Sequence, residues 1–198
     1  MELLKLIPDN MLVEKKYKKG TVIADQGSIC DNLSFVIKGE VIISTYTIDD
    51  KEYVISQLSV DDSFGEMIIF NPDNHYLGNI ISQKDTIIKS ISKHNLTMLL
   101  STNKDFLLAF LSHISSRAIN IQNRSKVLLQ NSIRDKILFY LNENYQKNND
   151  KTIYIDSKEN LAKYLNIPRP SLSRELINMR NEDIISFDRH KIIYKRPQ

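Results

Sequence analysis

The first half of the chain alternates short apolar, β-branched runs with glycines and polar turns. Five such runs are residues 21–24, 33–37, 40–44, 53–58 and 86–91. All five glycines lie within the first 78 residues, and Gly39 is expected to supply a turn conformation that other residues resist. Short β-branched runs separated by turn residues are typical of antiparallel strands. The pattern therefore predicts an antiparallel sandwich or barrel over residues 1–102.

Apolar residues take on helical spacing from about Asn103 to Gln130, where neither glycine nor proline interrupts the chain. Positions seven residues apart, and those adjoining them, form one stripe: Leu107, Leu111, Ile114, Ala118, Ile121 and Leu128. This spacing is close to the seam of a two-helix coiled coil. Residues 103–131 are therefore predicted to be a dimerisation helix and hinge. The alternative is a helix that packs on its own barrel without a partner chain.

Residues 132–198 form the third predicted segment. Asn131 and Ser132 offer a break and an N-cap for a helix from Ile133 to about Tyr145. A polar loop over 146–151 and a short strand over 152–155 follow. Either Asp156 or Ser157 can cap the next helix, and Glu159 stands at capping-box spacing from Asp156.

Residues 161–176 combine a short amphipathic helix, a tight turn and a second helix opened by proline. The second helix carries Arg169, Ser171, Ser173 and Arg174 close to its start. In a helix-turn-helix this part of the helix enters the major groove, where arginine can donate two hydrogen bonds to guanine. Apolar runs at 184–187 and 191–194 then predict a β-hairpin wing. Its turn would place Arg189 and Lys191 within reach of phosphate.

Charge is distributed unevenly along the chain. The net charge is +3. Residues 1–130 contain 14 Lys and Arg and 15 Asp and Glu, whereas residues 131–198 contain 13 Lys and Arg and 9 Asp and Glu. A basic C-terminal segment suits a DNA-binding module attached to a different function. No apolar run has membrane-spanning length and no secretory signal is evident, so a cytoplasmic protein without a membrane partner is expected.

Catalytic and metal-site motifs are missing from the sequence. There is no Gly-rich phosphate loop, no metal-spaced His/Asp/Glu set and no nucleophile elbow. The chain is therefore not expected to be an enzyme. Cys30 is the only cysteine, which excludes an internal disulfide and a four-cysteine metal or iron–sulfur site.

The three segments, in this order, resemble the Crp/Fnr family of bacterial transcription regulators. The motifs that carry the resemblance are residues 19–20, Gly27, 33–41 and 64–67 in the barrel, and 157–162 and 168–176 at the DNA-binding end. The resemblance implies an α+β protein with a jelly-roll barrel of the cyclic-nucleotide-binding type, a long dimerisation helix and a winged helix-turn-helix. It further implies a homodimer on a pseudo-palindromic site in double-stranded promoter DNA. RNA polymerase would be a further partner of an activator.

By resemblance, Arg169, Ser173 and Arg174 face the groove, while Ser171 and Lys158 contact phosphate. The chain departs from well-known members at Pro170, where they place a glutamate that accepts a hydrogen bond from cytosine. Because proline lacks that acceptor, the recognised sequence is expected to differ. The alternatives are that the arginines belong to a solvated or salt-bridged face, and that the barrel protein acts through protein contacts without specific DNA readout.

Members of the family that bind a cyclic nucleotide hold its phosphate with an arginine about eleven residues after the glycine of a Gly-Glu pair. The same count from Gly65 reaches Tyr76, and no Lys or Arg lies between Lys51 and Lys84. A buried phosphate without a cation is costly, so neither cyclic AMP nor cyclic GMP is expected to bind. The possible effector pocket comprises Gly65, Glu66, Met67, Tyr76, Leu77 and Ile121, in which Glu66 either holds a ribose hydroxyl or is structural.

Other cofactors of the family are not expected either. Haem would need an axial ligand, and no spacing singles out His75, His94 or His113. Cys30 could be a redox switch or form an intermolecular disulfide, but a lone cysteine is more often a small apolar residue. The remaining possibilities are an apolar or carboxylate effector, a protein partner, or no ligand.

Overall fold

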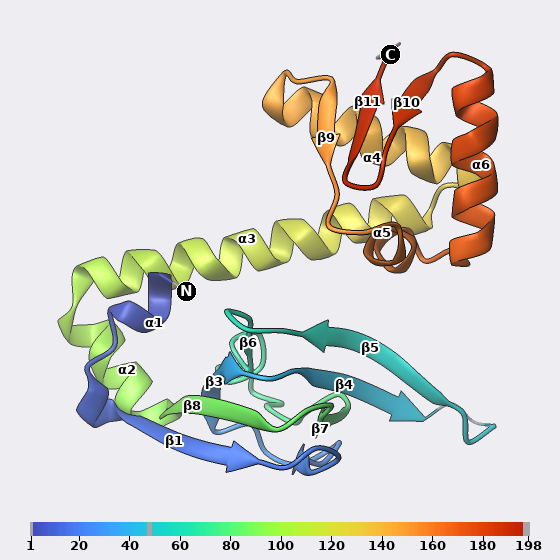
Figure 1. Cartoon of the computed structure of the whole chain (residues 1–198). Coiled ribbons are helices and arrows are strands. Elements are labelled where there is room, and N and C mark those ends of the chain that lie inside the picture. Colours follow the sequence, from blue (N-terminus) through green and yellow to red (C-terminus); the bar gives the residue numbers. More distant parts are fainter. Residues whose placement is uncertain (1, 47–48, 196–198) are drawn as a thin grey trace. The chain divides into compact units, whose positions relative to one another are not determined.

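The computed structural model describes residues 2–46 and 49–195 (Figure 1). The chain divides into two compact units, Met1–Ser116 and Arg117–Gln198, which are considered separately. The long helix α3 (Lys104–Leu128) contributes residues to both. The predicted α+β architecture, with antiparallel strands first and a helical segment with a small sheet last, is confirmed.

Two four-stranded antiparallel sheets build the N-terminal unit (Figure 1). One has the order β1 (Leu12–Tyr17), β8 (Thr86–Ser92), β3 (Asn32–Lys38), β6 (Ser63–Phe64), and the other β2 (Val22–Ala24), β7 (Asn79–Ser82), β4 (Val41–Tyr46), β5 (Glu52–Leu58). Three helical elements complete the unit before α3: α1 (Glu2–Lys5), the 3-10 turn η1 (Asp9–Met11) and α2 (Lys93–Thr102). All five predicted strands are present, and β1, β6, β7 and α2 are additional.

The first turns of α3 are anchored in the core of this unit. Phe106 and Phe110 are buried, and the Phe110 ring meets that of Phe70 edge-on at a centroid distance of 6.2 Å. Leu33 and Ile91, on neighbouring strands, are fully buried in the same core. One face of α3 therefore packs on its own unit, as the alternative interpretation required. The predicted seam overlaps this face, since its residue Ile114 also packs against the core.

The turn at Gly39 has the backbone conformation that the sequence predicts. Its φ is +91°, and a Cβ built there would lie 2.5 Å from Thr86 Oγ1 and 2.7 Å from the Asp85 carbonyl oxygen. Both the left-handed conformation and the close approach of the β8 segment exclude a side chain.

Replacing Gly39 with alanine is expected to lower the free energy of unfolding by about 2–4 kcal/mol, because backbone strain adds to overpacking. Gly20→Ala is the matched control, since Gly20 has φ +81° with no atom within 4 Å of its Cβ position. Urea denaturation should show a loss of only about 1 kcal/mol for the control. Equal losses for the two variants would show that the close approach has no effect.

The C-terminal unit continues from α3 into α4 (Ile133–Asn148), β9 (Thr152–Tyr154), α5 (Lys158–Leu165), α6 (Arg169–Asn181), β10 (Ile185–Phe187) and β11 (Lys191–Tyr194). The strands form an antiparallel sheet in the order β10–β11–β9. Its core gathers the buried faces of the helices and the sheet, with Leu141, Leu165, Leu176 and Ile192 fully buried. The predicted winged helix-turn-helix is thus present.

Capping side chains start two of these helices. Ser132 Oγ accepts a hydrogen bond from the Asp135 backbone N–H at 3.0 Å, as predicted for α4. For α5 the cap is Ser157, whose Oγ accepts from the Asn160 N–H at 3.0 Å. The alternative cap at Asp156, with its capping-box partner Glu159, is therefore wrong, because α5 begins one residue later than that pairing requires.

Candidate nucleic-acid interface and effector site

The turn between α5 and α6 fixes the direction of the second helix. Asn166 ends α5 in the left-handed conformation at φ +51°, and Pro168 caps α6 with an extended backbone. Leu172 and Leu176 then anchor one face of α6, where both are fully buried. The opposite face of α6 is left exposed at the surface of the unit.

Arg174 lies on this exposed face. Arg169 is also exposed, near the helix start, whereas Ser171 and Ser173 are half-buried. Within residues 2–46 and 49–195, neither arginine takes part in a salt bridge or a side-chain hydrogen bond. Of the two alternatives for these arginines, the salt-bridged face therefore finds no support, and the guanidinium donors are available to a ligand.

The carboxylates of α6 are held away from that face by Arg134 of α4. Arg134 Nε donates to Glu175 Oε1 at 2.6 Å, and its two terminal nitrogens donate to the two oxygens of Glu182 at 2.8 and 2.6 Å. Hydrogen bonding to Glu182, then to Glu175, raises the pKa of Arg134, and the same contact lowers the pKa of Glu182. This network neutralises acidic groups that would otherwise repel phosphate, and no local sequence pattern predicts it.

Arg134→Gln is expected to reduce the acid sensitivity of the C-terminal unit. Because the folded-state pKa of Glu182 is depressed, its stabilising contribution is present above the unfolded pKa and is lost as the pH falls through the folded value. Thermal midpoints measured between neutral pH and about pH 3 should thus fall less steeply in the variant than in the wild type. Lys136→Gln removes a charge from the same helix and should retain the wild-type dependence of the thermal midpoint on pH. If Lys136→Gln flattened that dependence as much as Arg134→Gln, the effect could not be assigned to the Arg134–Glu182 contact.

The start of α5 and the wing meet around Phe187. Lys158 Nζ lies 4.3 Å from the centroid of the Phe187 ring, and the Arg180 guanidinium carbon lies 5.3 Å from it on α6. At the wing turn, Arg189 is exposed, while Lys191 Nζ is 3.8 Å from an Asp188 carboxylate oxygen. The structure therefore brings Lys158 together with the wing and leaves Arg189 at the tip.

The predicted seam residues form a partly exposed stripe on α3. Leu111 and Ile121 are 50% and 56% exposed, Ala118 and Leu128 are exposed, and Leu107 and Ile114 are half-buried. A 25-residue helix that exposes leucine and isoleucine at this spacing has the apolar surface that a partner helix would cover.

The residues of the possible effector pocket occupy different surroundings in the described part of the chain. The N-terminal unit has a cavity of about 450 Å³ between its sheets, and among the six predicted residues only Tyr76 lines it. Glu66 is buried with Oε1 3.9 Å from His113 Nε2 of α3, and Met67 and Leu77 are exposed. Gly65 has φ +95° in a tight turn, and Ile121 belongs to the other unit.

Cys30 lies beside this cavity and is fully buried. Burial raises the pKa of its thiol and also raises the pKa of the neighbouring Tyr76. Cys30 Sγ lies 3.6 Å from the Asn32 carbonyl oxygen and 3.8 Å from that of Gly65. A protonated, inaccessible thiol is poorly reactive. The structure therefore favours the interpretation of Cys30 as a small apolar residue over a redox switch.

The histidines considered for haem have local partners or lie at the surface. His75 Nδ1 is 2.6 Å from an Asp73 oxygen, His113 Nε2 is 3.0 Å from Ser63 Oγ, and His94 is exposed. Across the described residues, no group of three or more His, Cys, Asp or Glu side chains has the placement of a metal site.

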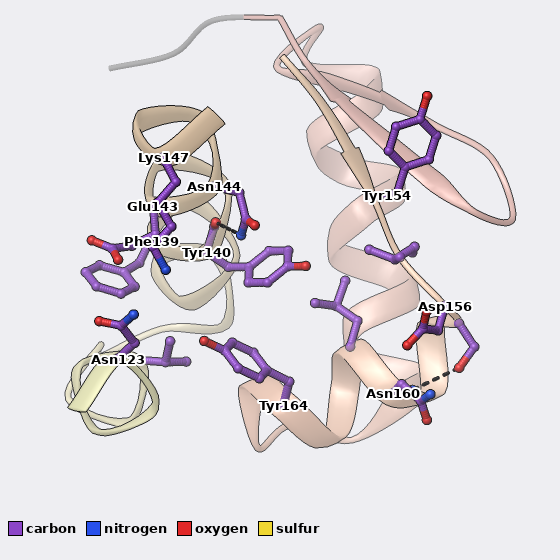
Figure 2. A pocket seen from close by; sticks show the side chains of 14 residues that line it. Asn123, Phe139, Tyr140, Glu143, Asn144, Lys147, Tyr154, Asp156, Asn160 and Tyr164 are labelled. Atoms are coloured by element: carbon purple, nitrogen blue, oxygen red, sulfur yellow. Dashed lines mark hydrogen bonds between the residues drawn. The ribbon is translucent and has the colours of Figure 1, made fainter. Parts of the chain in front are cut away.

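A second cavity, of about 390 Å³, lies within the C-terminal unit (Figure 2). Tyr140 reaches into it from α4 and Tyr164 from α5, with their rings edge-to-face at a centroid distance of 5.4 Å. Its charged lining groups are Glu143, Lys147 and Asp156. Two carboxylates and one cation suit an uncharged or cationic molecule better than a phosphate. This cavity could not be predicted from the sequence, because its lining residues come from four separate segments.

Comparisons with known proteins agree with this architecture. A family described as the cyclic nucleotide-binding domain matches residues 14–103. The anaerobic regulatory protein of Bacillus subtilis (strain 168) is 24% identical over 95% of this chain and 82% of its own. The cAMP-activated global transcriptional regulator CRP of Pasteurella multocida (strain Pm70) is 29% identical over 56% of this chain and 52% of its own.

Solved structures share the fold. One described as OCPA-complexed CprK superposes with a TM-score of 0.72 at 15% identity, covering 98% of this chain and 91% of that one. No helix within the described residues is both long and apolar enough to cross a membrane. The fold is that of a protein with a barrel unit and a winged helix-turn-helix unit. In sequence and fold the chain is similar to transcriptional regulators of the Crp/Fnr type.

Proposed function

We propose that the chain acts as a homodimer that binds a pseudo-palindromic promoter site through α6 of each protomer. The observation that carries the proposal is the exposed face of α6, where Arg174 is available while Glu175 and Glu182 are tied to Arg134. Pairing through the α3 seam would supply two recognition helices, which a palindromic site requires about one DNA turn apart. RNA polymerase would be a further partner if the protein activates transcription.

Fluorescence anisotropy on labelled genomic fragments tests this proposal. Specific binding should prefer some fragments over random duplex, and the affinity should fall steeply with salt because Lys and Arg displace counterions from phosphate. A protein that acts only through protein contacts would bind every duplex equally weakly, with or without cell extract. That outcome would support the alternative of a regulatory barrel without DNA readout.

We further propose that neither cyclic AMP nor cyclic GMP controls the protein, and that it uses no haem or iron–sulfur cluster. The barrel cavity has Lys15 as its one cationic lining residue among those described, and Lys15 is exposed on β1. Tyr76 stands where a phosphate-binding arginine would be needed, and its side chain carries no positive charge. A buried cyclic phosphate would thus lack a fixed cation.

Calorimetric titration with cyclic AMP and cyclic GMP is expected to show no binding at micromolar concentrations. The Pasteurella multocida regulator, described as cAMP-activated, serves as the positive control under the same conditions. A thermal-shift series with the same nucleotides provides a second readout. Saturable micromolar binding of either nucleotide would contradict the proposal.

A further inference from the structure

The exposed face of α6 carries apolar side chains on both sides of Arg174. Pro170, Arg174 and Ile177 are spaced by four and three residues, so they lie along one stripe of the helix. The stripe is opposite the buried Leu172 and Met179. We call Pro170, Arg174 and Ile177 the reading stripe.

Ile177 does not belong to the folding core of its unit. Its side chain is 42% exposed, and it is absent from both the buried residues and the partly buried apolar residues that pack around that core. Isoleucine is also a weaker helix former than lysine, arginine or glutamate, which are usual at an exposed helical position. Neither packing nor helix propensity therefore accounts for an isoleucine next to Arg174.

The major groove offers one apolar group for such side chains. Guanine, adenine and cytosine present hydrogen-bonding atoms at their edges, and thymine adds its C5-methyl group. With a rise of 1.5 Å per residue, Pro170 and Ile177 lie about 6 and 4.5 Å along the axis from Arg174. These distances correspond to about one or two base-pair steps of 3.4 Å on either side.

The reading stripe also lacks a group that would select cytosine. The side chains that usually select the cytosine amino group are the carboxylate acceptors glutamate and aspartate. The nearest carboxylate on α6, Glu175, accepts from Arg134 Nε at 2.6 Å and from Asn178 Nδ2 at 3.2 Å. The stripe therefore offers guanidinium donors at its centre and apolar surface at its ends.

We propose that Pro170 and Ile177 select thymine, through its methyl group, on either side of the guanine that Arg174 contacts. This inference rests on the proposed DNA binding and adds to it the base composition of the half-site. The half-site is accordingly a guanine with a thymine within two base pairs on either side, each on the DNA strand that faces the reading stripe.

Replacing thymine with deoxyuridine removes only the methyl group and tests this directly. Using a specific duplex found by selection, each thymine near the guanine is replaced in both half-sites and Kd is measured by anisotropy. One buried methyl corresponds to about a fourfold change in affinity, so a symmetric pair should weaken binding about fifteenfold. In Ile177→Ala the effect should disappear at the position read by Ile177 and remain at that read by Pro170.

Two further variants complete the test. Ile119→Ala removes another exposed isoleucine, from α3, and should retain the full deoxyuridine effect. Pro170→Glu places an acceptor at the start of α6, where glutamate is well tolerated, and should change the preferred base at its position from thymine to cytosine. Circular dichroism checks that each variant is folded.

The outcomes separate this inference from the proposed function. If wild-type protein prefers no duplex, the DNA-binding proposal fails. If it binds a specific site but deoxyuridine leaves Kd unchanged, or if Ile177→Ala keeps the full wild-type sensitivity at every position, thymine selection is overturned while specific binding stands.

Discussion

Arg174→Ala will lower the affinity for a specific DNA site by at least about 30-fold. A bidentate arginine–guanine pair discriminates by about 1–3 kcal/mol, and a dimer loses two of them, so the total is about 2–6 kcal/mol. Because Arg174 is exposed and without a salt bridge among the described residues, its removal should leave the thermal midpoint almost unchanged. Binding to random duplex should fall only slightly, so the main loss is of sequence preference.

Anisotropy on matched specific and random duplexes measures this ratio. Lys136→Ala is the control, since it removes one positive charge from α4 of the same unit and lies outside the predicted DNA contacts. Its specific-to-random ratio should remain that of the wild type. An Arg174→Ala protein that still distinguishes the specific site as well as the wild type would show that α6 reads DNA with other residues.

Placing two aspartates in the α3 seam will convert the proposed dimer to monomers. In Leu111→Asp with Ile121→Asp, paired charges would have to be buried in an apolar interface, which is strongly unfavourable. Light scattering coupled to size exclusion should show half the wild-type mass. Specific DNA affinity should fall by about 10²–10⁴-fold, because two half-sites are no longer bound by one linked pair of helices.

The matched control introduces the same charges on another face of α3. Leu108 and Ile119 are 55% and 53% exposed, nearly the same as Leu111 and Ile121, but they lie about a third of a turn from the seam. Leu108→Asp with Ile119→Asp should remain dimeric and bind DNA as the wild type does. A wild-type monomer, or a seam variant that keeps the dimeric mass, would contradict the proposed interface.

Local signals explain why the C-terminal unit could be predicted from the sequence. The helices of this unit have apolar periodicity, a serine N-cap at Ser132, and proline at the start of α6. These features involve residues close together in the chain, so they can be recognised in a single sequence. The choice between Asp156 and Ser157 as a cap could not be made, because the two differ by one residue in register.

Strand β1 and helix α2 were missed for physical reasons. Four of the six residues of β1 are exposed, as suits a lysine-rich edge strand, so the strand lacks the apolar alternation that marks a half-buried one. Helix α2 follows β8 directly, with Ser92 as both the last strand residue and the N-cap. No loop composition therefore separates the two elements in the sequence.

Contacts between segments that are distant in the chain could not be predicted from the sequence. Arg134 meets Glu175 and Glu182 across 41 and 48 residues, and no local pattern announces such a pairing. His113 likewise meets Glu66 only because α3 returns to the barrel. The arginines of α6 could be predicted because the helix-turn-helix pattern itself gives their positions.

Selection from a random duplex library with the wild-type protein, without added ligand, tests whether the chain reads DNA as a dimer through α6. We expect enrichment of two-fold-related half-sites with centres about 10–10.5 base pairs apart, each containing a guanine flanked by thymines. A library that stays random after repeated rounds, or that enriches only a single unpaired motif, would contradict a dimer that reads DNA through α6.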